Sequence, residues 1–234
     1  FADALNAATA GQTIKLLADV TLTEQVTIDK ETSLDLNGKT LSGSFAGDYG
    51  MIYVRKGIAL TIADSGENGS ITSSGTYAIG NYGSVTVKGG VIESTAADYA
   101  ALYNFYYNGE TYGTASIEGG EVNELWNCGD LTISGGSIAY VDNSGALTVT
   151  GGTVSEIYAQ DGSDAAEVPN AGTLSIEDTS AVSVPTGYTL AKNADGSYKV
   201  VVVNNVAEVG CVGYETFADA LNAATAGQTI KLLA

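Results

Sequence analysis

The sequence predicts an all-β fold in which short parallel strands stack as the coils of a solenoid. Two patterns predict it: a recurring apolar–polar–apolar triplet, and glycine-rich turn motifs at fixed places beside that triplet. A third observation concerns the whole chain, because residues 1–18 return unchanged at 217–234, a period of 216 residues. We expect the protein to be part of a tandem array, since long repeats of this kind are typical of extended proteins.

The triplets predict the strands. Each alternates in polarity, so its two apolar residues face one way while its central residue faces water. One such strand cannot bury its apolar side alone, whereas stacked copies can. The shortest interval between successive triplets, 16 residues, sets the size of one coil, and longer intervals indicate insertions at corners. The triplets are Leu34-Asp35-Leu36, Leu60-Thr61-Ile62, Val85-Thr86-Val87, Ala115-Ser116-Ile117, Leu131-Thr132-Ile133, Leu147-Thr148-Val149 and Leu174-Ser175-Ile176.

The turn motifs predict the corners. Gly-Gly pairs follow four triplets, and Asn-x-Gly motifs precede four. Glycine suits a corner because it adopts positive φ readily. Asparagine side chains at one corner of successive coils are expected to hydrogen-bond to each other along the axis, as an internal ladder. The predicted ladder residues are Asn81, Asn127, Asn143 and Asn170.

The ends of the period predict different elements. Phe217, Leu221 and Ala224 lie at helical spacing after Thr216, a favourable N-cap residue. This pattern predicts a short helix that caps a solenoid and forms the repeat junction, and we expect 217–234 to pack against the end of one. Residues 188–203 predict a hairpin that turns at 193–196, and 206–214 predict an extended strand. The predicted division is 1–187 for the solenoid with its N-terminal cap helix, 188–216 for the hairpin and inter-repeat strand, and 217–234 for the next cap.

These segments carry a resemblance to a known family. Residues 206–234 continued by Asp19-Val20-Thr21-Leu22, together with SLDLNGKTLSG at 33–43, resemble the pectate-lyase-like right-handed parallel β-helix modules of large tandem-repeat surface proteins. Such modules are frequent in anaerobic, gut-type Gram-positive bacteria. The resemblance covers essentially the whole chain. It implies a right-handed β-helix in a secreted or wall-attached protein, with neighbouring identical repeats as partners.

Composition excludes several functions. The 27 acidic and 9 basic residues give a net charge of −18, which opposes nucleic-acid binding because phosphate contacts need clustered Lys and Arg. Histidine is absent, which removes the Ser-His and Cys-His dyads and a usual zinc ligand. No stretch approaches the roughly 18 consecutive apolar residues of a membrane span, so we expect no direct membrane insertion.

We predict no catalytic site, metal or cofactor. Enzymes with a β-helix fold use clustered aspartates, but the triplets align Asp35 with Thr61 and other Thr or Ser residues, so no carboxylate pair forms. The acidic loop at 64–68 matches no calcium-binding motif, and ordinary turn chemistry explains its Asp and Asn residues.

Aromatic residues give the one candidate binding site. A tyrosine-rich insertion lies at 98–113, and a tryptophan follows one coil later. Tyrosine rings stack on sugar faces while their hydroxyls hydrogen-bond, so the insertion suits a host or bacterial glycan, or a protein receptor. The alternative is that the rings fill the interior and corners of a long coil. The candidate residues are Tyr99, Tyr103, Tyr106, Tyr107, Tyr112 and Trp126.

The two cysteines, Cys128 and Cys211, leave three alternatives open: a bond within the chain, a bond between chains, and free thiols. About three coils separate them, on the order of 15 Å along the axis, whereas the Cα atoms of a disulfide lie within about 7 Å. An interchain disulfide or free thiols are therefore favoured over an internal bridge.

Together these observations predict a non-enzymatic structural repeat of an extracellular fibre, stalk or adhesin. Its coils form a stiff rod, and rods join head to tail at Phe217–Ala234. The alternative function is a carbohydrate- or receptor-binding adhesin module that uses the Tyr99–Tyr112 insertion. We expect an extracellular, cell-surface or secreted filament location.

Overall fold

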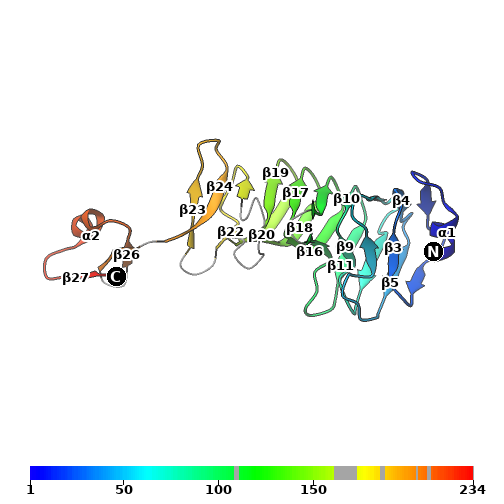
Figure 1. Ribbon diagram of the computed structural model, residues 1–234, viewed down its shortest axis with the longest axis horizontal. Coiled ribbons are helices and arrows are strands. Elements are labelled where there is room, and N and C mark those ends of the chain that lie inside the picture. The colour runs from blue at the N-terminus through cyan, green and yellow to red at the C-terminus, as the bar shows by residue number, and fades with distance from the viewer. Residues whose placement is uncertain (108–110, 161–172, 185–187, 204, 210–211, 234) are drawn as a thin grey trace.

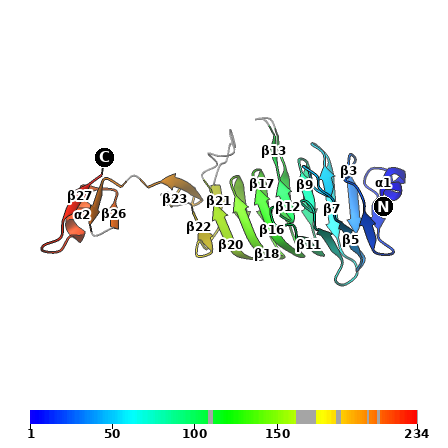
Figure 2. The same ribbon diagram turned by 90° about the horizontal axis from the view of Figure 1, so that it is seen from below.

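The computed structural model describes residues 1–107, 111–160, 173–184, 188–203, 205–209 and 212–233, and in these the protein is an all-β chain with parallel sheets. Successive strands lie side by side along one axis (Figures 1 and 2). We call one pass of the chain through both large sheets a coil. The two short helices of the described residues, α1 (Ala2–Ala7) and α2 (Phe217–Ala223), belong to the two copies of the duplicated segment.

The first large sheet has ten strands in the described residues. Eight are parallel and follow chain order, and an antiparallel hairpin completes the sheet. In spatial order they are β1 (Thr13–Lys15), β4 (Thr32–Asp35), β7 (Ala59–Ala63), β10 (Ser84–Val87), β15 (Thr114–Ile117), β17 (Asp130–Ile133), β19 (Ala146–Val149), β21 (Thr173–Ser175), β24 (Tyr198–Val202) and β23 (Tyr188–Lys192).

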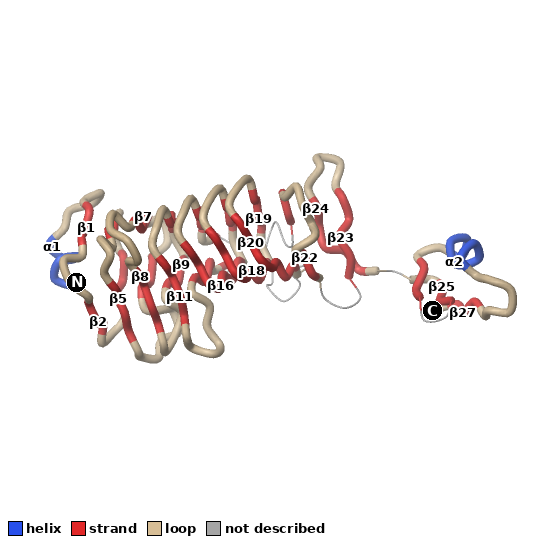
Figure 3. The backbone as a smooth tube through the Cα atoms, turned by 180° about the vertical axis from the view of Figure 1, so that it is seen from behind, coloured by secondary structure: helices blue, strands red, loops and turns tan. Residues whose placement is uncertain are grey.

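The second large sheet has twelve strands in the described residues, all paired in parallel. Coils early in the chain contribute two short strands each, whereas the coils that contain residues 121–159 contribute one strand of seven residues each. The strands are β2 (Val20–Leu22), β3 (Val26–Ile28), β5 (Thr40–Gly43), β6 (Ile52–Val54), β8 (Ser70–Ser73), β9 (Ile79–Asn81), β11 (Val91–Ser94), β12 (Leu102–Asn104), β16 (Glu121–Asn127), β18 (Ser137–Asn143), β20 (Thr153–Ala159) and β22 (Val182–Ser183). Figure 3 shows the two walls from behind.

The core lies between the two walls. Inward residues of successive coils align in register and are fully buried, as Leu34, Ile62 and Val87 do in the first sheet. Leu41 and Ile71 do the same in the second. Each such side chain stabilises the fold by about 1.5–3 kcal/mol relative to an exposed one. The apolar triplets therefore supply the core, as the sequence predicts.

One predicted alignment is wrong by two residues. The register pairs Ser33 with Thr61 and places Asp35 beside Ala63, whereas the sequence pattern aligned Asp35 with Thr61. A shift of two residues keeps every side chain on its face, so the apolar pattern alone does not distinguish the two registers. On its other side, Asp35 lies beside Lys15 of the preceding coil.

Insertions at corners explain the long intervals between triplets. β16 pairs with both β11 and β12, so the one strand spans what two strands and their connection span in the preceding coil. Residues 95–101 lie between β11 and β12. A second insertion follows β12 and contains the antiparallel strands β13 (Tyr106–Tyr107) and β14 (Thr111–Tyr112). The walls are thus constant and the corners vary.

A ladder of buried asparagine side chains runs along one corner. Asn81 Nδ2 donates to Asn104 Oδ1 at 2.8 Å, and Asn104 Nδ2 donates to Asn127 Oδ1 at 2.8 Å. Asn127 Nδ2 then donates to Asn143 Oδ1 at 2.7 Å. The sequence predicted three of these residues and missed Asn104. Asn170, the fourth predicted member, lies outside the described residues.

The Asn-x-Gly spacing follows from the same hydrogen bonds. Asn81 Oδ1 accepts a hydrogen bond from the Gly83 amide at 2.9 Å, and Asn127 Oδ1 accepts one from Gly129. The glycine is required because a Cβ on Gly83 would lie 2.2 Å from the Ile58 carbonyl oxygen of the preceding coil. The corner therefore needs an amide side chain and, two residues later, no side chain.

The two copies of the duplicated segment fold in different surroundings. In the first copy, Leu5 of α1 belongs to the main core. In the second, α2 packs on a small three-stranded sheet formed by β25 (Ala207–Val209), β26 (Val212–Tyr214) and β27 (Ile230–Leu232). This unit lies beyond the β23–β24 hairpin, away from the stacked coils (Figure 1).

Two expectations for this region are therefore corrected. Residues 217–234 do not pack against the end of the coils that precede them, because their apolar contacts are with β25 and β26. Residues 206–214 contain two antiparallel strands where the sequence predicted a single extended one. The predicted hairpin at 188–203 and the Thr216 cap are present, since β23 pairs with β24 and Thr216 Oγ1 accepts a hydrogen bond from the Asp219 amide.

We predict that Asn127→Ala lowers the free energy of unfolding by about 2–4 kcal/mol, because it removes the two buried hydrogen bonds that link Asn127 to Asn104 and Asn143. Asn123→Ala is the control, because Asn123 is half-buried in the same strand and lies outside the ladder. Urea denaturation followed by circular dichroism measures both. Equal losses in the two variants would contradict a special role for the ladder.

Candidate binding surface

The candidate surface lies on the outer face of the twelve-stranded sheet. Tyr103 stands between the buried residues Leu102 and Asn104, so its side chain faces outward. Trp126 lies beside it in the next coil. Tyr53 occupies the same column two coils earlier, with Gly80 between it and Tyr103. The stacking of coils thus brings aromatic residues that are far apart in sequence into one column.

Eight aromatic rings of the described residues form a continuous cluster around this column. Tyr82 stacks on Phe105 with ring centroids 4.4 Å apart and an interplanar angle of 8°. Tyr77 contacts Trp126 edge-on at 5.6 Å, and Tyr103 contacts Phe105 at 3.7 Å. We call this set the aromatic surface; its members are Tyr49, Tyr53, Tyr77, Tyr82, Tyr99, Tyr103, Phe105 and Trp126.

Gly80 leaves room for neighbouring groups to pack within the column. A Cβ at this position would lie 1.9 Å from the Tyr49 carbonyl oxygen and 3.1 Å from the Phe105 ring. The backbone of Tyr49 and the ring of Phe105 therefore cover the space that a side chain would fill. This close approach joins the rings of the earlier coil to those of the later one.

The predicted site residues divide into two groups. Tyr99, Tyr103 and Trp126 belong to the aromatic surface, and the alternative that they fill the coil interior fails for Tyr103 and Trp126, because Leu102 and Leu125 occupy it. The other three, Tyr106, Tyr107 and Tyr112, lie in the β13–β14 hairpin, and their side chains lie outside the described part of the structure.

Sequence reasoning missed five of the eight residues of the aromatic surface: Tyr49, Tyr53, Tyr77, Tyr82 and Phe105. A signal for Tyr53 was present, since Ile52-Tyr53-Val54 places an aromatic residue between two apolar ones. The triplets with a central Thr or Ser lie in the first sheet, whereas Tyr53 lies in the second. The other four residues lie in segments that connect strands, where the strand period gives no guide.

Hydrogen-bonding groups border the rings. Glu124 Oε1 accepts a hydrogen bond from Trp126 Nε1 at 2.7 Å. Burial raises the pKa of the Tyr77 hydroxyl to about 12, and burial and the neighbouring Cys128 raise that of Tyr103. These hydroxyls therefore remain protonated at neutral pH and are able to donate hydrogen bonds. Burial also raises the pKa of the nearby Asp142 carboxyl, against the hydrogen bond from Gln160.

Cys128 lies beside this surface as a free thiol. Its Sγ donates a weak hydrogen bond to Tyr103 Oη at 3.8 Å. Burial raises the pKa of the thiol, and the Asp142 carboxylate adds to the rise, while the Tyr103 contact opposes it. A protonated, half-buried thiol reacts slowly with disulfides. Cys211 lies outside the described residues, so the predicted interchain disulfide stays a prediction.

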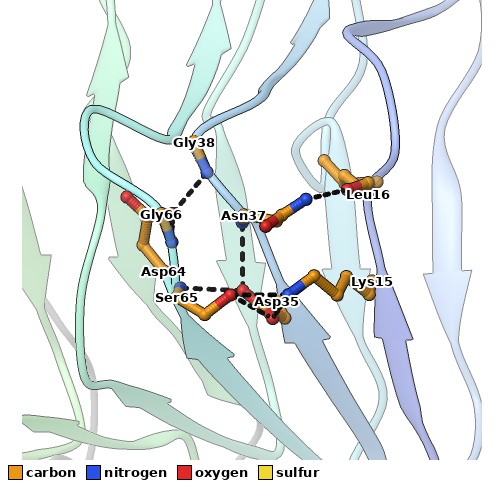
Figure 4. Close-up of polar contacts among 8 residues, drawn as sticks. All are labelled: Lys15, Leu16, Asp35, Asn37, Gly38, Asp64, Ser65 and Gly66. Atoms are coloured by element: carbon orange, nitrogen blue, oxygen red, sulfur yellow. Dashed lines mark hydrogen bonds and ion pairs between the residues drawn. The ribbon is translucent and has the colours of Figure 1, made fainter.

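Asp35 ties three successive coils together at the edge of the first sheet (Figure 4). Its Oδ1 accepts hydrogen bonds from the amides of Asn37 and Ser65, and its Oδ2 accepts one from Ser65 Oγ at 2.7 Å. Lys15 Nζ lies 3.2 Å from Oδ2. Burial opposes ionisation of the carboxyl, but these donors together outweigh it and lower its pKa to about 2.

Asp64 holds the adjoining turn in a similar way. Its Oδ1 accepts from the Gly38 amide at 2.7 Å, and its Oδ2 accepts from the Gly69 amide at 2.8 Å. A Cβ on Gly66 would lie 2.4 Å from the Gly38 nitrogen, so the two turns pack backbone against backbone. Both carboxylates are thus used to order turns.

Neither a metal centre nor a membrane span is found in the described part of the chain. It contains no group of three or more His, Cys, Asp or Glu residues placed to hold a metal ion. Its helices are too short and too polar to cross a membrane. Comparisons with protein-family models, curated proteins and solved structures give no match to this chain.

We predict that Asp35→Asn lowers the free energy of unfolding by about 1–3 kcal/mol at pH 7, because a charged acceptor of several hydrogen bonds is lost. The folded pKa, about 2, is below the ordinary value of 3.8, so this stabilisation is complete above about pH 5 and is lost as the pH falls through 2. Denaturant titrations at pH 7, 4 and 2 should show the two proteins converge. The exposed Asp98→Asn is the control, and a constant difference across this range would contradict the mechanism.

Proposed function

We propose that the chain is a non-enzymatic structural module, a right-handed parallel β-helix that stacks head to tail with identical repeats in an extracellular fibre, stalk or adhesin. The observation that carries this proposal is the growth of both sheets along a single axis. Eight parallel strands of the described first sheet follow in chain order, so added coils lengthen the molecule without widening it. The unchanged duplication at 217–234 supports an array of such modules.

Stiffness follows from the contacts between coils. Each coil is hydrogen-bonded to the next through both sheets, and the asparagine ladder adds side-chain bonds in a buried corner. Bending the rod would stretch these bonds on one side and compress packed side chains on the other. Interiors of protein density resist such changes, because they contain few voids. A module of this kind suits a role as a rigid spacer.

The ends support a role in controlled assembly. An uncovered parallel edge invites pairing with other chains. At one end of the first sheet, the antiparallel β23–β24 hairpin covers β21. The net charge of −18 keeps long neighbouring rods apart in solution. The module is thus proposed to join through its ends and to repel along its sides.

We predict that chains of one, two and three repeats appear in negative-stain electron microscopy as rods whose length rises in equal steps. Each added repeat should contribute about 4.8 Å per coil plus the junction, because coils rise by one strand spacing. The distribution of angles at the junctions measures stiffness. Compact particles, or beads joined at random angles, would contradict the proposal.

A second candidate function is glycan binding by the aromatic surface. The specific observation is that eight rings gather on one outer wall beside hydrogen-bonding groups, where a soluble module needs none of them for its core. Sugar faces stack on such rings. The flanking Glu124 and Asp142 and the net charge oppose anionic sugars, so a neutral glycan is the proposed ligand.

We predict that Tyr103→Ala and Trp126→Ala each weaken binding to a neutral insoluble polysaccharide by at least about fivefold, because each removes a stacking ring. Pull-down on cellulose, chitin and mannan measures the bound fraction. Thr132→Ala, on the outer face of the other sheet, is the matched control and should bind as the unaltered chain does. Unchanged binding in both ring variants would assign the aromatic surface to packing alone.

A further inference from the structure

The two copies of the duplicated segment bury different faces of the same helix. In the first copy Leu5 is 4% exposed, whereas the identical residue Leu221 is 56% exposed. The neighbouring helix position shows the reverse pattern of burial. Ala220 is 0% exposed and packs against β25 and β26, whereas its counterpart Ala4 is exposed. One face therefore fits stacked coils, and the other fits the β25–β26 hairpin.

The strand that follows the helix shows the same division. Leu16 donates its amide hydrogen to the carbonyl of Asp35 on β4, at 2.9 Å. In the second copy, Leu233, the counterpart of Leu17, donates its amide hydrogen to Val206 at 2.9 Å. Consecutive residues of a strand point their N–H groups to opposite edges. β25 therefore occupies the edge of this strand that β4 does not use.

Side-chain directions agree with this placement. In β27, Ile230 packs with Ala207 and Val209, and its counterpart Ile14 faces the main core, so the inward face is shared. On the outward face, Lys231 pairs with Glu208 at 3.7 Å, while its counterpart Lys15 pairs with Asp35 at 3.2 Å. A lysine at this position thus has a carboxylate partner on either side.

We propose that residues 217–234 form a shared joint that is sandwiched between two identical repeats, an inference that rests on the head-to-tail array proposed above. One face holds the β25–β26 hairpin of the preceding repeat, and the other holds the first coils of the following repeat. β25 then becomes an antiparallel outer strand of the following repeat's first sheet. The boundary between folding units lies between β24 and β25, and the array is built from units that begin near Val206.

The occupant is specified by the first copy itself. Leu5, Ile14 and Leu16 show how an identical segment buries its apolar side chains on coils of this sequence. In the second copy the corresponding face is open, with Leu232 at 69% exposed against 4% for Leu16. The coils that would cover it are those equivalent to residues 19–63, because these follow the first copy in the chain.

Hydrogen exchange tests this joint directly. The single-repeat chain is compared with an extended chain in which residues 19–234 are appended after Ala234. Amides of 217–234 should gain at least about tenfold protection in the extended chain, because both edges of the strand are then paired. Leu221→Asp should abolish this gain. Asn222→Asp, which adds the same charge at a position exposed in both copies, should retain it.

Two further measurements separate the possible failures. If protection does not rise while electron microscopy still shows a straight rod of double length, the joint is wrong and the rod proposal stands. If protection rises but no rod is seen, the joint holds and the rod proposal fails. A single-repeat chain that dimerises in ultracentrifugation, and is returned to monomer by Leu221→Asp, would assign the open face to side-by-side contact and overturn the joint.

Discussion

Every buried side chain in the main body of this protein depends on the hydrogen bonds between successive coils. A single coil contributes only one or two strands to each wall and is too thin to enclose a core. Only when the next coil lies in register do the inward residues of the two meet, as Leu34 meets Ile62. The repeated triplet therefore constrains the residues of the neighbouring coils as well as those of its own coil. It specifies what lies above and below each residue, which is why one polar or one bulky inward residue would disturb three coils at once.

The corners between strands are less constrained than the walls. The two walls must keep the strand spacing, but a corner needs only to return the chain to the next coil. The asparagine ladder and the backbone contacts of Gly83 fix one corner tightly. The corner between β11 and β12 is freer, and the insertion there carries Tyr99 onto the aromatic surface. The same division places constant residues in the walls and the candidate binding residues beside them.

The limits of sequence-based prediction follow from this architecture. The strands, the minimal coil and the ladder were predictable, because their residues recur at fixed spacing. Asn104 was not, because an insertion separates it from Gly113, which takes the glycine's place in the corner motif. The position of Asp35 was missed, because a slip of two residues leaves the polarity pattern unchanged. The aromatic surface was only partly predicted, because most of the missed rings lie in connecting segments that no period describes.

The duplicated segment poses a harder problem for prediction, because its residues have two sets of partners. Its pattern shows an amphipathic helix, and a helix of this kind needs one apolar partner. The structure reveals a second, small-residue face at Ala220 that allows the hairpin strands to approach closely. The larger leucine thus suits the stacked coils, which pack farther from the helix, and the smaller alanine suits the hairpin, which packs closer. A substitution on either face affects a contact of one copy, which gives a physical reason for the leucine and the alanine to be kept in both copies.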